Sequence, residues 1–195
     1  VGSEMCIRDS PGPAFLEGDA VVAETALSRA GRGRTADFLE YYRVCFADGD
    51  FRDFWKWRYG SQKSYTPDYY RAGYVAIAGI RSIYDEPNFT ARYFRRIADR
   101  HGLAFFNLNG TVKDIAGKSF NKAFSEVSDS LAAFWTVDEK SRAPFIPMTT
   151  VVKTPQRFTE YENLTIAGDA IYAVRKSLTS PEELVNIDKN GKERV

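Results

Sequence analysis

The chain has 195 residues, of which 44% are hydrophobic, 27% charged and 14% aromatic, a composition that fits one packed domain plus part of another and excludes a disordered tail. Its formal net charge of +1 gives no electrostatic basis for nucleic acid or an anionic membrane as a partner. Two Cys exclude a disulfide framework, one His excludes a two-His zinc site made by this chain alone, and no apolar run approaches the roughly 20 residues of a membrane span.

Both ends of the sequence indicate a fragment of a longer protein. Residues 1–10 show neither helical nor strand periodicity and resemble a translated sequencing adapter of the kind that begins reading frames from environmental DNA. We therefore expect them to be an artefact or disordered. The other end, residues 192–195, lies directly after a turn signal and within an expected strand.

The first part of the chain shows helix signals. Residues 15–27 are mostly small and apolar, which predicts a buried helix. Thr35 predicts the N-cap of a second helix that ends near residue 47. Residues 51–65 are expected to form an aromatic, basic loop. The pair Thr66-Pro67 then predicts a helix start, because Thr caps well and Pro suits the first helical position; this helix runs to about residue 84.

This helix is expected to be central, because residues 73–80 carry no polar side chain apart from the Tyr74 hydroxyl. Gly73 and Gly79 would let neighbouring backbones approach it closely. Further helices are predicted at residues 88–100, with His101 satisfying its last carbonyls, at residues 111–116, and from Ser119 onward with apolar residues at helical spacing from Phe120 to Phe134.

The composition changes after Arg142. Pro144, Pro147 and Pro155 disfavour a helix, and strands are expected at residues 164–166, 170–174, 184–187 and 192–195. Asn190-Gly191 predicts a tight two-residue hairpin between the last two strands. The predicted fold class is therefore mainly α followed by a short antiparallel β segment, with a helical region at residues 11–143, a linker at 144–150 and a strand region at 151–195.

One segment carries a specific resemblance. Phe15-Leu16-Glu17-Gly18-Asp19-Ala20 resembles the third-ligand helix of gluzincin zinc peptidases, whose His-Glu-x-x-His helix supplies two His ligands and the general base. The resemblance implies that Glu17 is the third zinc ligand, with the two His residues preceding the chain. The residues alone also allow a first-turn carboxylate favoured by the helix dipole. Glu24 would lie on the same helix face and orient a ligand His, or form an ion pair at the surface.

A second segment resembles the same peptidases. Tyr69-Tyr70-Arg71-Ala72-Gly73-Tyr74 is similar to their Tyr-x-Lys-Gly-Ala helix, with Ala72 in place of the usual Lys. The resemblance implies that Tyr70 stabilises the oxyanion of the tetrahedral intermediate, with Tyr74, one turn on, as the fallback. The alternative is a core aromatic helix start.

The order of motifs along the chain resembles bacterial proteins in which a peptidase MA-like gluzincin domain precedes a TolB-like β-propeller. The motifs are Gly31-Arg32-Gly33-Arg34, Lys56-Trp57-Arg58-Tyr59-Gly60-Ser61, Tyr65-Thr66-Pro67 and Gly117-Lys118-Ser119-Phe120. Residues 170–173, 184–188 and 191–193 are similar to the opening propeller blade. The resemblance implies that residues 11–143 are the C-terminal helical part of the peptidase domain and that residues 151–195 are a first, incomplete blade.

The function implied by this resemblance is that of a zinc metallopeptidase of the bacterial envelope, a hydrolase acting on peptide or protein substrates. It implies a periplasmic, outer-membrane-associated or secreted location. This chain alone is expected to be inactive and not to retain zinc, because the His-Glu-x-x-His helix is missing. The alternative is a non-catalytic peptidase-like domain in a propeller-based binding scaffold. Substrate, number of blades and oligomeric state stay open.

Overall fold

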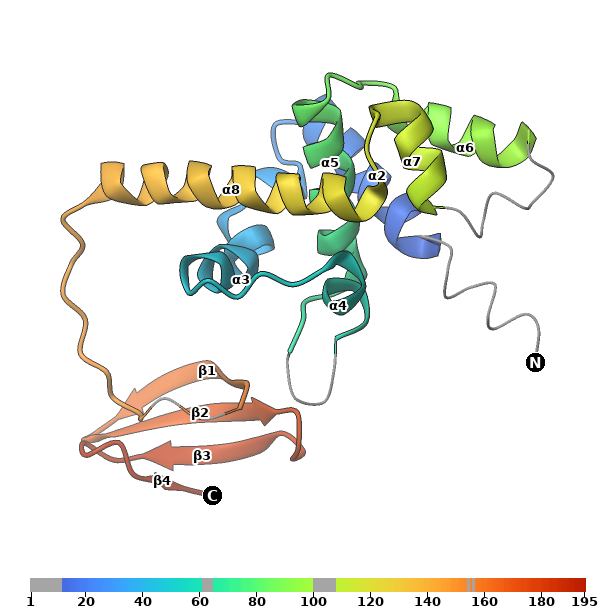
Figure 1. The fold of residues 1–195 in the computed structure, drawn as a ribbon. Helices are drawn as coiled ribbons and strands as arrows, with labels where there is room; N and C mark the ends of the chain where they lie inside the picture. The colour runs from blue at the N-terminus through green and yellow to red at the C-terminus, as the bar shows by residue number, and fades with distance from the viewer. Residues whose placement is uncertain (1–11, 61–64, 100–107, 154, 156) are drawn as a thin grey trace. The chain divides into compact units, whose positions relative to one another are not determined.

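The computed structural model describes residues 12–60, 65–99, 108–153, 155 and 157–195. The chain divides into two compact units, one of residues 1–60 and 66–143 and the other of residues 61–65 and 144–195. The first is helical and the second is a small antiparallel sheet (Figure 1). The predicted fold class is confirmed. The predictions for residues 1–10 and His101 lie outside the described residues.

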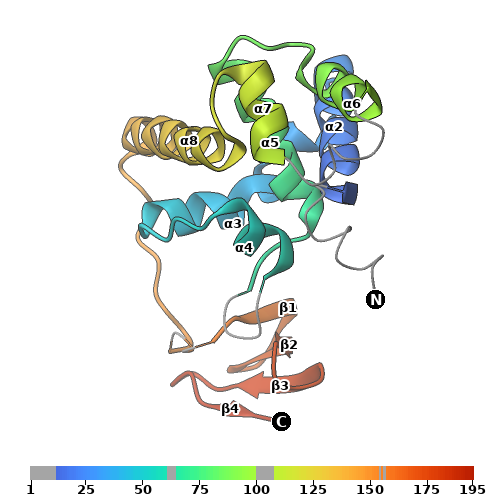
Figure 2. The same cartoon turned by 45° about the vertical axis from the view of Figure 1, so that its right-hand side comes forward.

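The helical unit is built around one central helix, α5. Its elements are α2 (Gly12–Leu27), the 3₁₀ helix η1 (Arg32–Arg34), α3 (Ala36–Ala47), α4 (Phe54–Tyr59), α5 (Tyr69–Ile83), α6 (Phe89–Asp99), α7 (Leu108–Ala116) and α8 (Phe120–Arg142). Helix α5 contacts α2, α4, α6 and α8. Its most extensive contact is with α2, which lies beside it in both views (Figures 1 and 2). The apolar stretch predicted to be central is buried at Gly73, Val75, Ala76, Ile77 and Ile80.

Aromatic side chains join the helices into one core. Phe15 on α2 is fully buried, and its ring centroid lies between 5.2 and 6.2 Å from those of four other rings. These four are Phe54 on α4, Phe89 and Tyr93 on α6, and Phe120 on α8. Buried aromatic pairs of this kind contribute about 0.5–1.5 kcal/mol each beyond the burial of their area.

The prediction of a loop at residues 51–65 was wrong, because α4 lies within it. Asp53 caps this helix: its carboxylate accepts a hydrogen bond from the backbone N–H of Lys56 at 2.9 Å. Phe54 and Trp57 are three residues apart on one helix face and are both buried. The aromatic residues of this segment therefore form a buried helix face.

The predicted start of α5 at Thr66-Pro67 was also wrong. The N-cap is Asp68, whose carboxylate accepts hydrogen bonds from the backbone N–H groups of Tyr70 at 3.1 Å and Arg71 at 3.3 Å. Because Asp is a stronger N-cap than Thr, it sets the helix start two residues later. The start of α8 after Ser119 agrees with prediction.

The apolar face expected along α8 is buried only in its first half. Phe120, Ala123, Phe124 and Val127 are buried, whereas Phe134, predicted on the same face, is 63% exposed. Trp135 packs on the core instead, with its ring 5.5 Å from that of Phe46. The second half of α8 contacts α3 through Trp135 and through the ion pair of Asp138 with Arg43, and Phe134 is exposed beside this contact. The last turns of α8 extend away from the other helices (Figure 1).

The strand unit is a four-stranded antiparallel sheet in the order β1-β2-β3-β4. Its strands are β1 (Thr159–Ala167), β2 (Ala170–Ser177), β3 (Glu183–Ile187) and β4 (Glu193–Arg194). Ala173, paired with Val185, and Ile171, paired with Ile187, lie on the face that forms a small core. Asn163, with φ of 53°, lies at a register shift in β1.

The hairpin between β3 and β4 is present, but its predicted two-residue turn is not. The backbone N–H of Gly191 donates to the carbonyl of Asp188 at 2.8 Å, so Lys189 and Asn190 are the central residues of the turn. The Asp188 carboxylate accepts from the N–H groups of Asn190 and Lys192. Gly191, with φ of 74°, follows as the left-handed residue of a longer hairpin loop.

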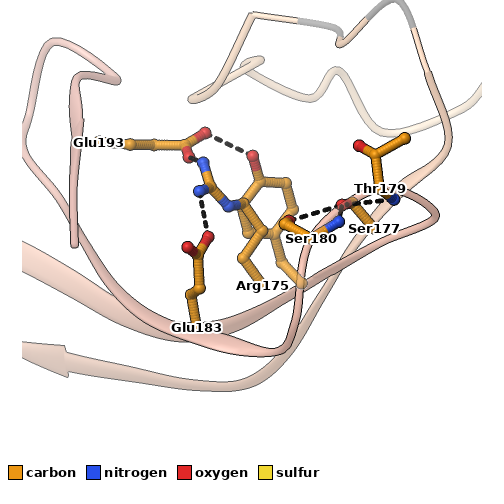
Figure 3. A network of polar contacts seen from close by, with 7 residues as sticks. Arg175, Ser177, Thr179, Ser180, Glu183 and Glu193 are labelled. Atoms are coloured by element: carbon orange, nitrogen blue, oxygen red, sulfur yellow. Dashed lines mark hydrogen bonds and ion pairs between the residues drawn. The ribbon is translucent and has the colours of Figure 1, made fainter.

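A polar network ties the four strands together at one place on the sheet (Figure 3). The guanidinium of Arg175 on β2 bridges Glu183 on β3 and Glu193 on β4, the latter at 2.6 Å. The Tyr161 hydroxyl on β1 donates to the same Glu193 carboxylate, and burial together with this contact raises the pKa of Tyr161 to about 12. The network explains how a two-residue strand, β4, is held in place.

Candidate functional site

The close crossing of α2 and α5 depends on two glycines. A Cβ atom on Gly18 would lie 2.3 Å from the carbonyl carbon of Gly73, and one on Gly73 would lie 1.7 Å from the carbonyl oxygen of Ala14. Both contacts are with backbone, so no side chain can move to make room. The predicted close approach at Gly73 is therefore present, whereas at Gly79 the neighbour is the Val127 side chain.

This crossing brings Glu17 and Tyr70 together. Glu17 directly precedes Gly18, and Tyr70 lies one turn before Gly73; both side chains are half-buried. Partial burial, followed by the negative charge of Glu17, raises the pKa of the Tyr70 phenol. The crossing thus brings two residues that were predicted to share a zinc site close enough for their charges to interact.

Tyr74, the fallback for Tyr70, has a different environment. Its ring meets that of Phe38 edge-on at 5.6 Å. A Cβ on Gly33 would lie 2.4 Å from the Tyr74 hydroxyl, so the phenol is covered by the loop. Burial raises the pKa of Tyr74. The geometry therefore favours Tyr70 over Tyr74 as the partner of Glu17.

Glu24 forms an ion pair with Arg32, a residue that sequence reasoning did not single out. Its carboxylate accepts from the Arg32 backbone N–H at 2.8 Å and from Arg32 Nε at 3.0 Å, and these bonds lower the pKa of Glu24. The Arg32 guanidinium carbon also lies 5.3 Å from the centroid of the Tyr70 ring. Arg32 thus contacts both Glu24 and Tyr70. In the sequence, the one feature that marked this residue was the run Gly31-Arg32-Gly33-Arg34.

The donor set fits part of a zinc site. Within the described residues, no group of three or more His, Cys, Asp or Glu side chains lies close enough to hold a metal ion. Glu17 offers one carboxylate next to a phenol, which is chemically suitable for one of three protein ligands.

None of the helices within the described residues is long and apolar enough to cross a membrane.

Comparison of the chain with models of protein families, with curated proteins and with solved structures finds no match. Fold and site are therefore interpreted from the residues and their geometry.

Proposed function

We propose that the helical unit is the C-terminal helical part of a gluzincin zinc peptidase domain, in which Glu17 is the third zinc ligand and Tyr70 is the oxyanion stabiliser. The observation that carries this proposal is the closeness of Glu17 and Tyr70 at the Gly18–Gly73 crossing, where the Glu17 charge acts on the Tyr70 phenol. The two residues are distant in sequence, and each lies in a segment that resembles the same family. The two His ligands belong to a preceding helix.

The chemistry of the two residues suits peptide hydrolysis. Zinc, when bound, supplies a Lewis acid that activates water and polarises the carbonyl. Glu17 contributes a negative oxygen ligand, and the adjacent Gly18 lies directly against the backbone of Gly73 on α5. Tyr70 presents a phenolic O–H on the Glu17 side of α5, where it donates to the oxyanion that develops on the substrate carbonyl.

We propose further that residues 151–195 are the first, incomplete blade of a TolB-like β-propeller. Four antiparallel strands in sequential order are the arrangement of a propeller blade, and this order supports the proposal. Together, the two domains point to a hydrolase of the bacterial envelope that acts on peptide or protein substrates. The chain alone supplies one of the ligands and is proposed to be inactive.

The test uses the chain extended upstream through the parent gene, with two substitutions. Glu17→Gln removes the charge of the ligand, so zinc affinity falls and activity returns only partly with excess metal. Tyr70→Phe removes one hydrogen-bond donor, so zinc content stays intact while kcat falls by roughly 10²–10³ and KM changes little. Zinc stoichiometry and kcat are measured on the same preparations.

Two matched controls lie away from the site. Glu40→Gln makes the same charge change at an exposed position of α3, and Tyr172→Phe removes an exposed phenol hydroxyl from β2. Both should leave zinc content and kcat unchanged. Full zinc content in Glu17→Gln, full activity in Tyr70→Phe, or an upstream sequence without His-Glu-x-x-His would contradict the proposal; the last outcome would favour a non-catalytic scaffold.

A further inference from the structure

Arg32 is held rigidly beside the candidate site. The loop that carries it is fastened to the end of α2: the Gly33 N–H donates to the Thr25 hydroxyl at 3.1 Å, and Arg34 donates to the Thr25 carbonyl through Nε at 3.1 Å and Nη2 at 2.8 Å. Gly31 is also in close contact, since a Cβ there would lie 2.3 Å from the Thr25 Cα. The backbone of Arg32 therefore has little freedom.

The Arg32 side chain is fixed on one edge and open on another. Nε donates to Glu24, and the guanidinium lies over the Tyr70 ring. Among the described residues, neither terminal nitrogen of Arg32 has a hydrogen-bond partner, and the side chain is 47% exposed. Two parallel N–H groups at the end of a guanidinium match a carboxylate in a bidentate pair.

The local charge also suits an anionic ligand group. Arg32 and Arg34 lie in the same 3₁₀ helix, and the Glu24 carboxylate pairs with Arg32 through Nε, away from its two terminal nitrogens. Stacking on Tyr70 also removes part of the water from the guanidinium face, which strengthens a charge-assisted hydrogen bond.

We propose that Arg32 determines substrate specificity by binding a carboxylate of the peptide substrate. This inference rests on the proposed function. Because Arg32 contacts the ring of the proposed oxyanion residue, and one extended residue spans about 3.3–3.6 Å, this carboxylate belongs to a residue within one or two positions of the cleaved bond. It is either the C-terminal carboxylate or the side chain of Asp or Glu.

The test on the 195-residue chain is a titration followed by NMR of the ¹⁵N-labelled arginine side chains. One arm compares acetyl-trialanine with its C-terminal amide. The other compares the amidated acetyl-Ala-Glu-Ala peptide with its Gln counterpart. An isolated charge-assisted pair corresponds to a Kd of about 10–100 mM, so each peptide is added to about 100 mM at constant ionic strength. If acetyl-trialanine shifts the Arg32 resonances and its amide does not, Arg32 binds a C-terminal carboxylate. If the Glu peptide shifts them and its Gln counterpart does not, Arg32 binds an acidic side chain.

The matched control is Arg29→Gln, which removes the same charge from an exposed position of the same loop. It should leave the carboxylate-specific shifts of Arg32 intact. In the Arg32 variants, binding is followed by the backbone amide shift of the neighbouring Gly33 in uniformly ¹⁵N-labelled chain. Arg32→Gln should abolish the preference for the carboxylate peptide, and Arg32→Lys, which keeps the charge but not the fork, should weaken it several-fold. Circular dichroism of each variant shows that the helices remain folded.

The extended enzyme provides a second measurement. Arg32→Gln should raise KM for the carboxylate substrate by about 10-fold or more while leaving zinc content and kcat unchanged. Equal shifts with carboxylate and amide peptides, or equal effects of Arg29→Gln and Arg32→Gln, would overturn the role of Arg32. Those outcomes would leave the Glu17 and Tyr70 results standing, whereas full zinc content in Glu17→Gln would refute the function itself.

Discussion

The substitution Gly73→Ala tests whether the α2–α5 crossing is as tight as the structure shows. The added Cβ would lie 1.7 Å from the Ala14 carbonyl oxygen, whereas carbon–oxygen contacts are ordinarily about 3.3 Å or longer. The two backbones must therefore separate by roughly 1.5 Å. A gap of this size removes about half or more of the dispersion contacts across it.

The cost follows from what α2 buries. Phe15 and Val21 are fully buried, and burying such a side chain is worth about 1.5–3 kcal/mol, so losing half of this for both costs about 1.5–3 kcal/mol. Strain in the crowded crossing adds about 1–3 kcal/mol to this destabilisation, whereas the higher helix propensity of Ala reduces it by about 1 kcal/mol. We expect a net destabilisation of about 1.5–5 kcal/mol, measured by urea unfolding followed at the helical circular dichroism signal.

Gly79→Ala on the same helix is the matched comparison. Its Cβ would lie 2.3 Å from a methyl group of Val127, so the obstacle is a side chain that can be truncated. In a Val127→Ala background the remaining Cβ at position 127 lies 3.0 Å from the new Cβ. A shift of a few tenths of an ångström relieves this contact, so adding Gly79→Ala should be close to neutral, because the propensity gain of about 1 kcal/mol offsets the cost. No such rescue exists for Gly73, because its neighbours are backbone atoms. A Gly73→Ala chain as stable as the unsubstituted one would refute the tight crossing.

Two further predictions concern the cap of α5 and alkaline pH. Asp68→Ala should destabilise the helical unit by about 1 kcal/mol, whereas Thr66→Ala should have little effect; the reverse order in urea unfolding would mean that the cap is misassigned. The pKa values of Tyr84 and Tyr161 are raised from 10 to about 12 by burial and by carboxylate partners. Their contribution to stability is therefore complete below pH 10 and lost as the pH rises through about 12. In an alkaline titration, ionisation of both should coincide with unfolding, and ionisation near pH 10 in a folded chain would contradict this.

Periodicity and composition were sufficient to predict the helices and strands with long signals. The buried stretch of α5 and the helix α2 follow from runs of small and apolar residues. The misses occur where one side chain decides a boundary. Asp53 and Asp68 cap helices through hydrogen bonds that compete with nearby Thr, Pro and aromatic signals, and Asp188 organises a longer turn than Asn190-Gly191 alone predicts.

The candidate site was only partly accessible from the sequence, for a related reason. Glu17 and Tyr70 were identified by their resemblance to family motifs, and Glu24 by its spacing of seven residues from Glu17 on one helix face. Arg32 was not, because its significance comes from three contacts made in space: the Glu24 carboxylate, the Tyr70 ring and the anchored loop. A short run of Gly and Arg gives the same signal whether the guanidinium faces solvent or a site.

The two glycines of the crossing are as much a part of the candidate site as its carboxylate. Gly18 follows Glu17 directly, and Gly73 lies one turn after Tyr70, so the backbone distance that they permit also sets the distance between the two side chains. Sites that bind metal or stabilise an oxyanion require positions within about 0.5 Å. A displacement of roughly 1.5 Å, which a packed core can partly absorb, exceeds that tolerance about three-fold. Under the proposed function, glycine at these two positions is required by the placement of Glu17 and Tyr70 as well as by packing, and this requirement would account for the helix-propensity cost in α5.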